Sequence, residues 1–208
     1  SLVSACSGSA SSYGTDDWTR RAESALGQVF GRDVRAFFVA TGTAANCLAL
    51  SAVANPWDAI LCHRQAHIAI DELSAPEFFT GGARLLPLET ASGKITAKDL
   101  HASLDTIPAQ RPHNVRASAL SVSQATENGL VYSQAELAQL ADAAHQRGIH
   151  VHMDGARFAN AVATLACEPA DITWKAGIDV LSLGASKNGA LSAEAVVFFN
   201  DELARDFD

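Results

Sequence analysis

The fold is decided by the stretch Gly-Ile-His-Val-His-Met-Asp-Gly-Ala-Arg at residues 148–157. Apolar residues lead up to Met153 and the polar residue Asp154 follows at once, as at the end of a buried strand. A second segment of this kind, Ile-Asp-Val-Leu-Ser-Leu at 178–183, is followed by Gly-Ala-Ser and then Lys187. Because ligands of open parallel sheets bind beyond the carboxyl ends of the strands, we expect Asp154 and Lys187 to face one ligand site.

Strand and helix patterns alternate along the rest of the chain. Strand patterns occupy residues 36–40, 59–62, 83–88, 117–122, 149–153, 178–183 and 194–199. Helix patterns occupy the stretch from a cap at Asp16 or Asp17 to Gly31, a stretch that opens at Thr41, residues 67–79, 134–146, 157–165 and 170–176, and the segment from 201 onward. Strands that alternate with helices pair in parallel through right-handed crossovers. We therefore predict one α/β domain over residues 1–208.

The composition is that of a globular protein that binds a small molecule. The 208 residues are 48% hydrophobic, which is enough for a sizeable core. Fifteen basic and 23 acidic residues give a net charge of −8, and lysine and arginine do not cluster. This balance argues against a nucleic-acid or anionic-membrane surface and makes a small-molecule ligand the expected partner.

The cysteines and the apolar runs indicate a cytoplasmic protein. The four cysteines, Cys6, Cys47, Cys62 and Cys167, have no Cys-x-x-Cys spacing, so we expect inert free thiols and neither a metal site nor a disulfide framework. No apolar run approaches the roughly 18 residues that span a bilayer. The first dozen residues also lack the basic region and apolar core of a signal peptide.

Lys187 and Asp154 together suggest a pyridoxal 5'-phosphate (PLP) enzyme. That chemistry requires an amine that forms a Schiff base with the cofactor aldehyde and a carboxylate that keeps the pyridine nitrogen protonated. Taken singly, the two residues have more ordinary explanations, a solvated surface lysine and an Asp-Gly turn. Their positions at the ends of two predicted buried strands favour the cofactor site.

The start of the helix that opens at Thr41 offers a site for a phosphate. Thr41, Gly42 and Thr43 provide unpaired backbone N–H groups, two hydroxyls and a glycine that lets the backbone approach an anion closely. An ordinary hydroxyl cap is the simpler interpretation of this turn when it is taken alone. The phosphate interpretation depends on the other residues of the site.

Three more polar residues follow predicted strands. His67 begins the helix pattern 67–79, and its imidazole could stack on an aromatic cofactor or transfer protons near neutral pH. Glu72 either reaches the same cavity or is solvated. Arg157 lies three residues after Asp154, and its planar fork suits a phenolate or carboxylate oxygen. A structural histidine and a surface arginine are the alternatives.

Five segments carry a resemblance to a known family. They are Tyr-Gly-Thr-Asp-Asp-Trp-Thr at 13–19, Thr-Gly-Thr-Ala-Ala-Asn at 41–46, Gln-Ala-His at 65–67, His-Met-Asp-Gly-Ala-Arg-Phe at 152–158 and Ser-Lys-Asn-Gly at 186–189. Together they resemble the low-specificity threonine aldolases, within the aromatic-amino-acid β-eliminating lyase group of fold-type I PLP enzymes. The last segment is similar to the branch that includes phenylserine aldolases. The resemblance implies the three-layer α/β/α large domain of these enzymes with a mostly parallel sheet, and a homodimer or homotetramer.

The resemblance also implies which residues hold the cofactor. Lys187 is expected to be the Schiff-base lysine, and Asp154 the partner of the pyridine nitrogen. Gly42 and Thr43 are expected to bind the phosphate. His67 is expected to stack on the ring.

The resemblance further implies a set of substrate contacts. Arg157 is expected near the phenolic oxygen of the cofactor or the carboxylate of the substrate. Tyr13, in the Tyr-Gly-x-Asp segment, and His113, a second family histidine, are expected near the substrate. His67, His113, Glu72 and a bound water remain open as the catalytic base.

The implied reaction is cleavage of a β-hydroxy-α-amino acid, of the threonine or phenylserine type, to glycine and an aldehyde through the Schiff base on Lys187. Family members also carry an initial Ser-Asp segment and a smaller C-terminal domain, and we expect both to be missing from residues 1–208. Two alternatives stay open. They are PLP-dependent β-elimination, which gives a keto acid and ammonia, and a folded module without activity.

Overall fold

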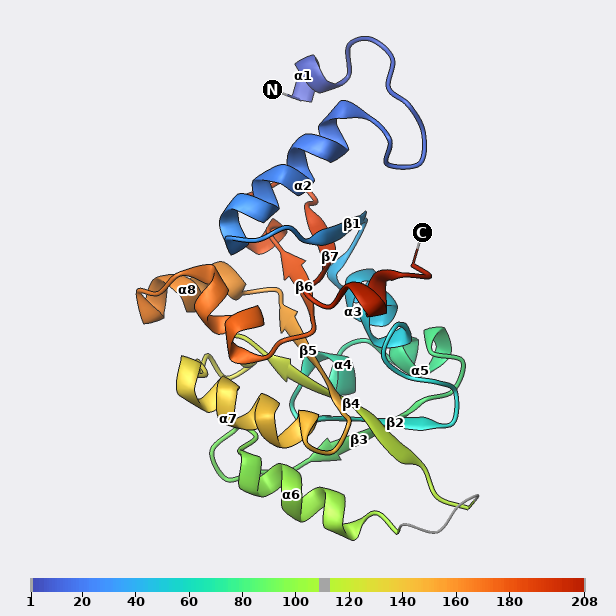
Figure 1. Cartoon of the computed structure of the whole chain (residues 1–208), viewed down its shortest axis with the longest axis vertical. Helices are drawn as coiled ribbons and strands as arrows, with labels where there is room; N and C mark the ends of the chain where they lie inside the picture. Colours follow the sequence, from blue (N-terminus) through green and yellow to red (C-terminus); the bar gives the residue numbers. More distant parts are fainter. Residues whose placement is uncertain (1, 109–112, 208) are drawn as a thin grey trace.

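The architecture is one twisted sheet with helices on both faces (Figure 1). The computed structural model describes residues 2–108 and 113–207. Within these residues the strands are β1 (Arg35–Val39), β2 (Asp58–His63), β3 (Arg84–Leu88), β4 (Arg116–Ser123), β5 (His150–Gly155), β6 (Val180–Gly184) and β7 (Glu194–Phe198). They lie in the order β1-β7-β6-β5-β4-β2-β3, and β7 runs antiparallel to both β1 and β6.

The helices form a layer on each face of the sheet. One hydrophobic core joins the sheet to α2 (Asp17–Phe30), α6 (Ala97–Thr106), α7 (Gln134–His145) and α8 (Phe158–Leu165). A second core joins the opposite face to α3 (Gly42–Ser51) and α4 (His67–Ile70), and α5 (Ala75–Phe79) packs against α3. The predicted three-layer α/β/α arrangement with a mostly parallel sheet is therefore confirmed.

The central strands are buried on both faces. In β2 every residue from Asp58 to Cys62 is buried, and β4 is buried from Ala117 to Val122. Parallel strands that are covered on both faces have this pattern, because both sets of side chains enter a core. The predicted strands accordingly match the observed ones closely.

The register of the sheet places several polar side chains close together near the carboxyl ends of the parallel strands. Ser121 of β4 pairs with His152 of β5, and Asp154 of β5 pairs with Ser182 of β6. These positions alternate with residues of the first core, so they lie on the face that α3 covers. The sheet therefore places a polar cluster near the carboxyl ends of its parallel strands.

The predicted helix over 67–79 is wrong, because the segment forms two short helices. α4 ends at Ile70 and α5 begins at Ala75. Between them Leu73 has a positive φ of 52°, which a continuous helix does not allow. Pro76 lies in the first turn of α5, where a backbone N–H would have no helical carbonyl to bind, so the lack of this group in proline costs no hydrogen bond.

Other local predictions also need correction. The predicted helix over 170–176 is a pair of 3-10 turns, η1 (Pro169–Ile172) and η2 (Trp174–Ala176), and the segment after residue 200 forms the 3-10 turn η4 (Asp201–Ala204). Helix α6 was not predicted, although Thr96 and Asp99 form a capping box at its start. The short α1 (Leu2–Ala5) was not predicted either. Across the described ranges, no helix has both the length and the apolar character needed to cross a membrane.

Candidate active site

A cavity of about 220 Å³ opens at the carboxyl edge of the sheet, on the face that α3 covers. Its wall comes from the first turn of α3, from α4 and from the residues that follow β4, β5 and β6. These segments are far apart in the sequence, and they meet because parallel strands end at the same edge. Five residues expected at the cofactor line this cavity, namely Gly42, Thr43, His67, Asp154 and Lys187.

The first turn of α3 forms one wall. Thr41 caps the helix, and its hydroxyl accepts a hydrogen bond of 3.1 Å from the amide of Ala44. The amides of Gly42 and Thr43 lie in the first turn of α3, where no helical carbonyl is in position to accept their hydrogen bonds. The turn therefore presents N–H groups and the positive end of the helix dipole. Glu194 also lines the cavity. A Cβ atom added to Gly42 would lie 3.6 Å from Oε2 of Glu194.

Asp154 is a buried carboxylate at the end of β5, with 6% of its surface exposed. Its Oδ1 accepts from the amide of Ala156 at 3.0 Å, and its Oδ2 accepts from Nδ2 of Asn46 on α3 at 3.0 Å. Both donors are neutral. In the described part of the chain Asp154 has no cationic side chain as an ion-pair partner.

His152, two residues earlier on β5, does not supply the missing positive charge. Its ring is fully buried, and burial lowers its pKa to about 4. Nδ1 lies 2.9 Å from the hydroxyl of Ser121, and Nε2 lies 2.9 Å from the hydroxyl of Ser182. A neutral imidazole between two hydroxyls satisfies its hydrogen bonds, so His152 adds no cation beside Asp154.

Lys187 lies on the turn η3 (Ser186–Asn188), directly beyond β6. The turn is tied in place, because Ser186 accepts from the amide of Ala193 at 3.2 Å and Asn188 donates to Asn160 at 3.0 Å. The side chain of Lys187 lines the cavity, and none of the described carboxylates forms an ion pair with it. Lys187 and the buried Asp154 thus line one cavity, and among the described residues neither has an ion-pair partner.

His67 and Glu72 form a pair on the α4 side. Nδ1 of His67 lies 2.9 Å from Oε1 of Glu72, and the same oxygen accepts from Asn46 at 2.9 Å. Burial raises the pKa of the Glu72 carboxyl, as does the nearby charge of Asp154, while the hydrogen bonds from Asn46 and His67 oppose the rise. Glu72 therefore belongs to the cavity and is not a solvated residue.

Arg157 reaches the cavity through a second acidic residue. Its Nη1 lies 3.2 Å from Oε2 of Glu127, and Glu127 lines the cavity from the loop after β4. Arg157 itself is 38% exposed and stands beside the cavity, at the start of α8. The structure therefore places this guanidinium close to the expected site but already partnered by a carboxylate.

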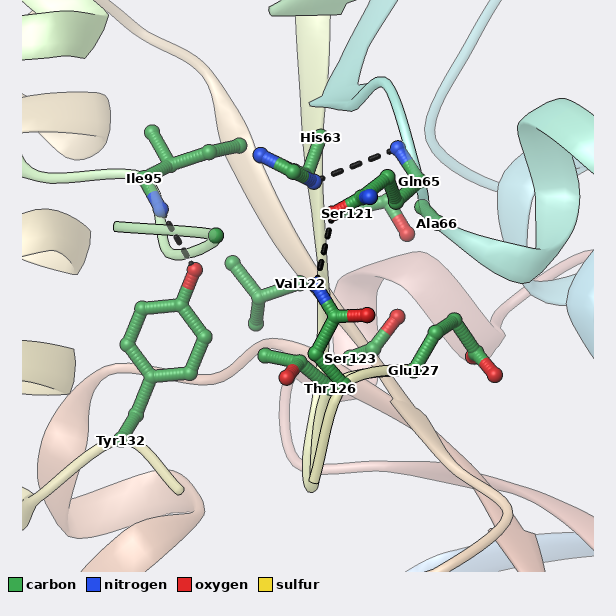
Figure 2. A pocket seen from close by; sticks show the side chains of 12 residues that line it. His63, Gln65, Ala66, Ile95, Ser121, Val122, Ser123, Thr126, Glu127 and Tyr132 are labelled. Carbon is green, nitrogen blue, oxygen red and sulfur yellow. Dashed lines mark hydrogen bonds between the residues drawn. The ribbon is translucent and has the colours of Figure 1, made fainter. Parts of the chain in front are cut away.

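The loop that carries Glu127 is held firmly. Gln124 donates to the carbonyl of Tyr132 at 2.8 Å and accepts from the amide of Tyr132 at 2.9 Å. Figure 2 shows a small pocket that Thr126 and Glu127 of this loop line together with Gln65. Gln65 accepts a hydrogen bond of 2.8 Å from Asn128. This pocket has a volume of about 10 Å³, room for about one water and not for a cofactor. It borders the larger cavity at Glu127.

Two expected substrate residues do not reach the cavity of their own chain. His113 is exposed and stands just before β4, whose carboxyl end at Ser123 faces the cavity, so it lies at the opposite edge of the sheet. Tyr13 is fully exposed in the segment that precedes α2. This geometry gives no support to their predicted roles.

Among the cavity-lining residues to which the sequence patterns gave no role are Asn46, Glu127 and Glu194. Asn46 follows the Thr-Gly-Thr turn by one helical turn, a spacing that could have indicated it. Glu127 follows the carboxyl end of β4, and Asp154 lies at the carboxyl end of β5. Because ligands bind beyond the carboxyl ends of parallel strands, the position of Glu127 could also have indicated a role in the site. Glu194 begins β7, and nothing in the sequence identified β7 as the antiparallel strand.

Comparison with known proteins agrees with this arrangement. The sequence matches the family described as Beta-eliminating lyase over residues 2–206. It is 45% identical over 198 residues to the low specificity L-threonine aldolase of Pseudomonas aeruginosa, which covers 94% of this chain and 56% of that protein. It is 32% identical over 190 residues to the alanine racemase TOXG of Cochliobolus carbonum, with 89% of this chain and 46% of that protein covered.

A solved structure matches the fold as well as the sequence. The threonine aldolase of Leishmania major superposes with a TM-score of 0.91 at 26% identity, and the match covers 99% of this chain and 59% of that one. The chain thus spans about half the length of the relatives that it matches. The predicted resemblance to threonine aldolases is confirmed, and the chain belongs to the beta-eliminating lyase family.

Proposed function

We propose that this protein binds PLP in the cavity and cleaves a β-hydroxy-α-amino acid, of the threonine or phenylserine type, to glycine and an aldehyde. The observation that carries the proposal is the pair formed by Asp154 and Lys187. The buried carboxylate and the lysine line one cavity, and neither has an ion-pair partner in the described ranges 2–108 and 113–207. The similarity to a threonine aldolase over 94% of the chain supports the choice of reaction.

The residues present fit this cofactor. A buried carboxylate that only neutral donors bind is unfavourable, and a protonated pyridine nitrogen would supply the charge that Asp154 lacks. The first-turn amides of Gly42 and Thr43 would bind the phosphate. The amine of Lys187 would bind the aldehyde carbon, and the ring of His67 would lie against the pyridine. When bound, PLP supplies an electron-withdrawing ring that stabilises negative charge on the α-carbon of the substrate.

The side chains of the cavity divide the remaining tasks. Cleavage between the α- and β-carbons requires a group that accepts the proton of the β-hydroxyl. Glu72 is turned toward Asn46 and His67, and His113 stands at the far edge of the sheet, so His67 is the better placed of the three. Arg157 is placed to hold an anionic oxygen of the substrate or cofactor beside Glu127.

A second candidate reaction is favoured by the alanine racemase TOXG, which is 32% identical to this chain. Racemisation would use the same cavity to remove and return the α-proton, without cleavage of a carbon–carbon bond. β-Elimination to a keto acid and ammonia is a third outcome. Product analysis separates the three, because they give glycine, the opposite enantiomer or ammonia.

The test is to load the purified protein with PLP and to incubate it with threonine, phenylserine and alanine. We expect a visible absorption band from the bound cofactor and glycine from the first two substrates. Lys187→Ala should lose both, and Lys175→Ala, which alters an exposed lysine paired with Asp171, should retain them. An unchanged band in Lys187→Ala would overturn the assignment of the lysine.

A further inference from the structure

A buried chain of polar side chains runs behind the cavity, from His67 to Asp154. Nδ1 of His67 lies 2.9 Å from Oε1 of Glu72. One nitrogen of Asn46 donates both to this oxygen, at 2.9 Å, and to Oδ2 of Asp154, at 3.0 Å. The members come from α4, the turn that follows it, α3 and β5, so the chain joins both helices to the sheet.

Glu72 is buried more deeply than an ordinary acidic residue. The residue is 4% exposed and its side chain is not exposed at all. Its Oε2 and the Oδ1 of Asn46 have no hydrogen-bond partner in the described structure. Burial of a carboxylate at such a place is unfavourable, and among the described residues Asn46 and His67 are the donors that bind this carboxylate.

The contact between Glu72 and His67 decides which ring nitrogen carries the proton. An ionised carboxylate only accepts hydrogen bonds, so Nδ1 of a neutral His67 must be the donor. The other nitrogen, Nε2, is then an acceptor. Neutral imidazole that is free in water prefers the opposite form, with the proton on Nε2, and the bond that one nitrogen makes sets the state of the other.

We propose that Glu72 is a positioning residue of the cofactor cavity, which holds His67 with its proton on Nδ1 and links it through Asn46 to Asp154. The role in the cavity rests on the proposed function. His67 then offers a lone pair on Nε2, as a group that accepts a proton from a substrate hydroxyl must. Without Glu72 the same ring would offer an N–H group and could not accept that proton.

Burial raises the pKa of Glu72 and so works against the ionised form that this placement of His67 uses. Burial is the largest cause, and the charge of Asp154 adds to it. The hydrogen bonds from Asn46 and His67 act against the rise, so each of them stabilises the carboxylate form. Removal of the Asn46 donor is therefore expected to weaken the hold of Glu72 on His67.

The test reads the tautomer of His67 directly, in protein without cofactor. Long-range proton–nitrogen NMR spectra of 15N-histidine-labelled protein distinguish a protonated Nδ1 from a protonated Nε2, and His67→Gln identifies the signals. We expect the proton of His67 on Nδ1 in the wild type and on Nε2 in Glu72→Ala. Glu72→Gln keeps an oxygen that accepts from Nδ1, so His67 should keep the wild-type tautomer in that variant. Glu89→Ala, which removes an exposed carboxylate paired with Arg64, is the matched control and should leave the spectrum unchanged.

Two results would overturn the inference. One is a wild-type spectrum with the proton of His67 on Nε2, which needs no variant and so does not depend on whether Glu72→Ala folds. The other is a folded Glu72→Ala protein with the wild-type tautomer. Binding of PLP should also weaken roughly tenfold in Glu72→Ala, as expected for the loss of a hydrogen bond to a charged group.

The inference and the proposed function fail in different ways. A protein that binds PLP and releases glycine while His67 carries its proton on Nε2 would refute the role of Glu72 alone. A protein with the expected tautomer that neither binds PLP nor releases glycine would refute the proposed function. In that case Glu72 would still be shown to fix the histidine.

Discussion

Nδ2 of Asn46 lies 3.0 Å from Oδ2 of Asp154, a contact between residues 108 positions apart in the sequence. The same nitrogen binds Glu72, so one amide orients two buried carboxylates. Asn46→Ala removes the donor from both and should lower the free energy of unfolding by about 1–3 kcal/mol for each carboxylate left without it. Urea unfolding of the cofactor-free protein measures this loss. Asn160→Ala, at an exposed asparagine, is the control, and an equal effect of both changes would contradict the assignment.

The guanidinium of Arg157 should not be replaceable by an ammonium group. Its planar fork can bind Glu127 and a second oxygen at the same time, whereas lysine is a point charge. We expect Arg157→Lys to raise KM for the amino acid or to weaken PLP binding by about tenfold, with little change in stability. Steady-state kinetics and cofactor titration separate the two effects. Wild-type values for both would mean that Arg157 serves only to hold Glu127.

The buried thiols should be inert. Burial raises the pKa of Cys47 to about 12, with further contributions from Glu72 and Glu77, and burial also raises the pKa of Cys62 to about 12. A thiol attacks as the thiolate, so neither should react with Ellman's reagent near neutral pH until the protein unfolds. Cys6 is exposed and should react at once, so the expectation of an inert thiol is wrong for this residue. Rapid modification of Cys47 in the native protein would show that α3 opens more readily than its packing indicates.

The strands and much of the site follow from simple patterns in the sequence. Burial on both faces makes the central strands rich in apolar residues, and parallel strands end at one edge, which is why Asp154 and Lys187 line one cavity. The failures have equally definite causes. The split between α4 and α5 depends on the positive φ of Leu73, which an apolar periodicity does not reveal.

Contacts between layers were beyond the reach of sequence patterns. The pairing of Asn46 with Asp154 depends on how α3 sits on the sheet, and the pairing of Glu127 with Arg157 depends on a loop. His113 was placed near a strand, but proximity in the sequence does not say which end of the strand matters. It precedes β4, and the cavity lies beyond the other end of that strand.

The last prediction concerns stability away from the cavity. Nε2 of His145, at the end of α7, lies 2.9 Å from Asp179, which also accepts from the amide of Val151 at 2.8 Å. The hydrogen bond to Asp179 raises the pKa of His145 above its ordinary value, against the effect of partial burial. When folding raises the pKa of a histidine, the protonated ring stabilises the fold. The stabilisation is complete at pH values below the pKa of that histidine in the unfolded chain, near 6.5. It is lost as the pH rises through the pKa of the histidine in the folded protein.

A double-mutant cycle between His145→Ala and Asp179→Ala should therefore give a coupling energy that depends on pH. The side chain of His145 is 40% exposed, so solvent screening limits the coupling to about 1 kcal/mol at most. We expect this value at about pH 5.5 and a smaller one at about pH 9, because the imidazole is then neutral. Urea unfolding of the four proteins at both pH values gives the result. A coupling energy that is equal at the two values would show that the charge of His145 contributes nothing to the fold.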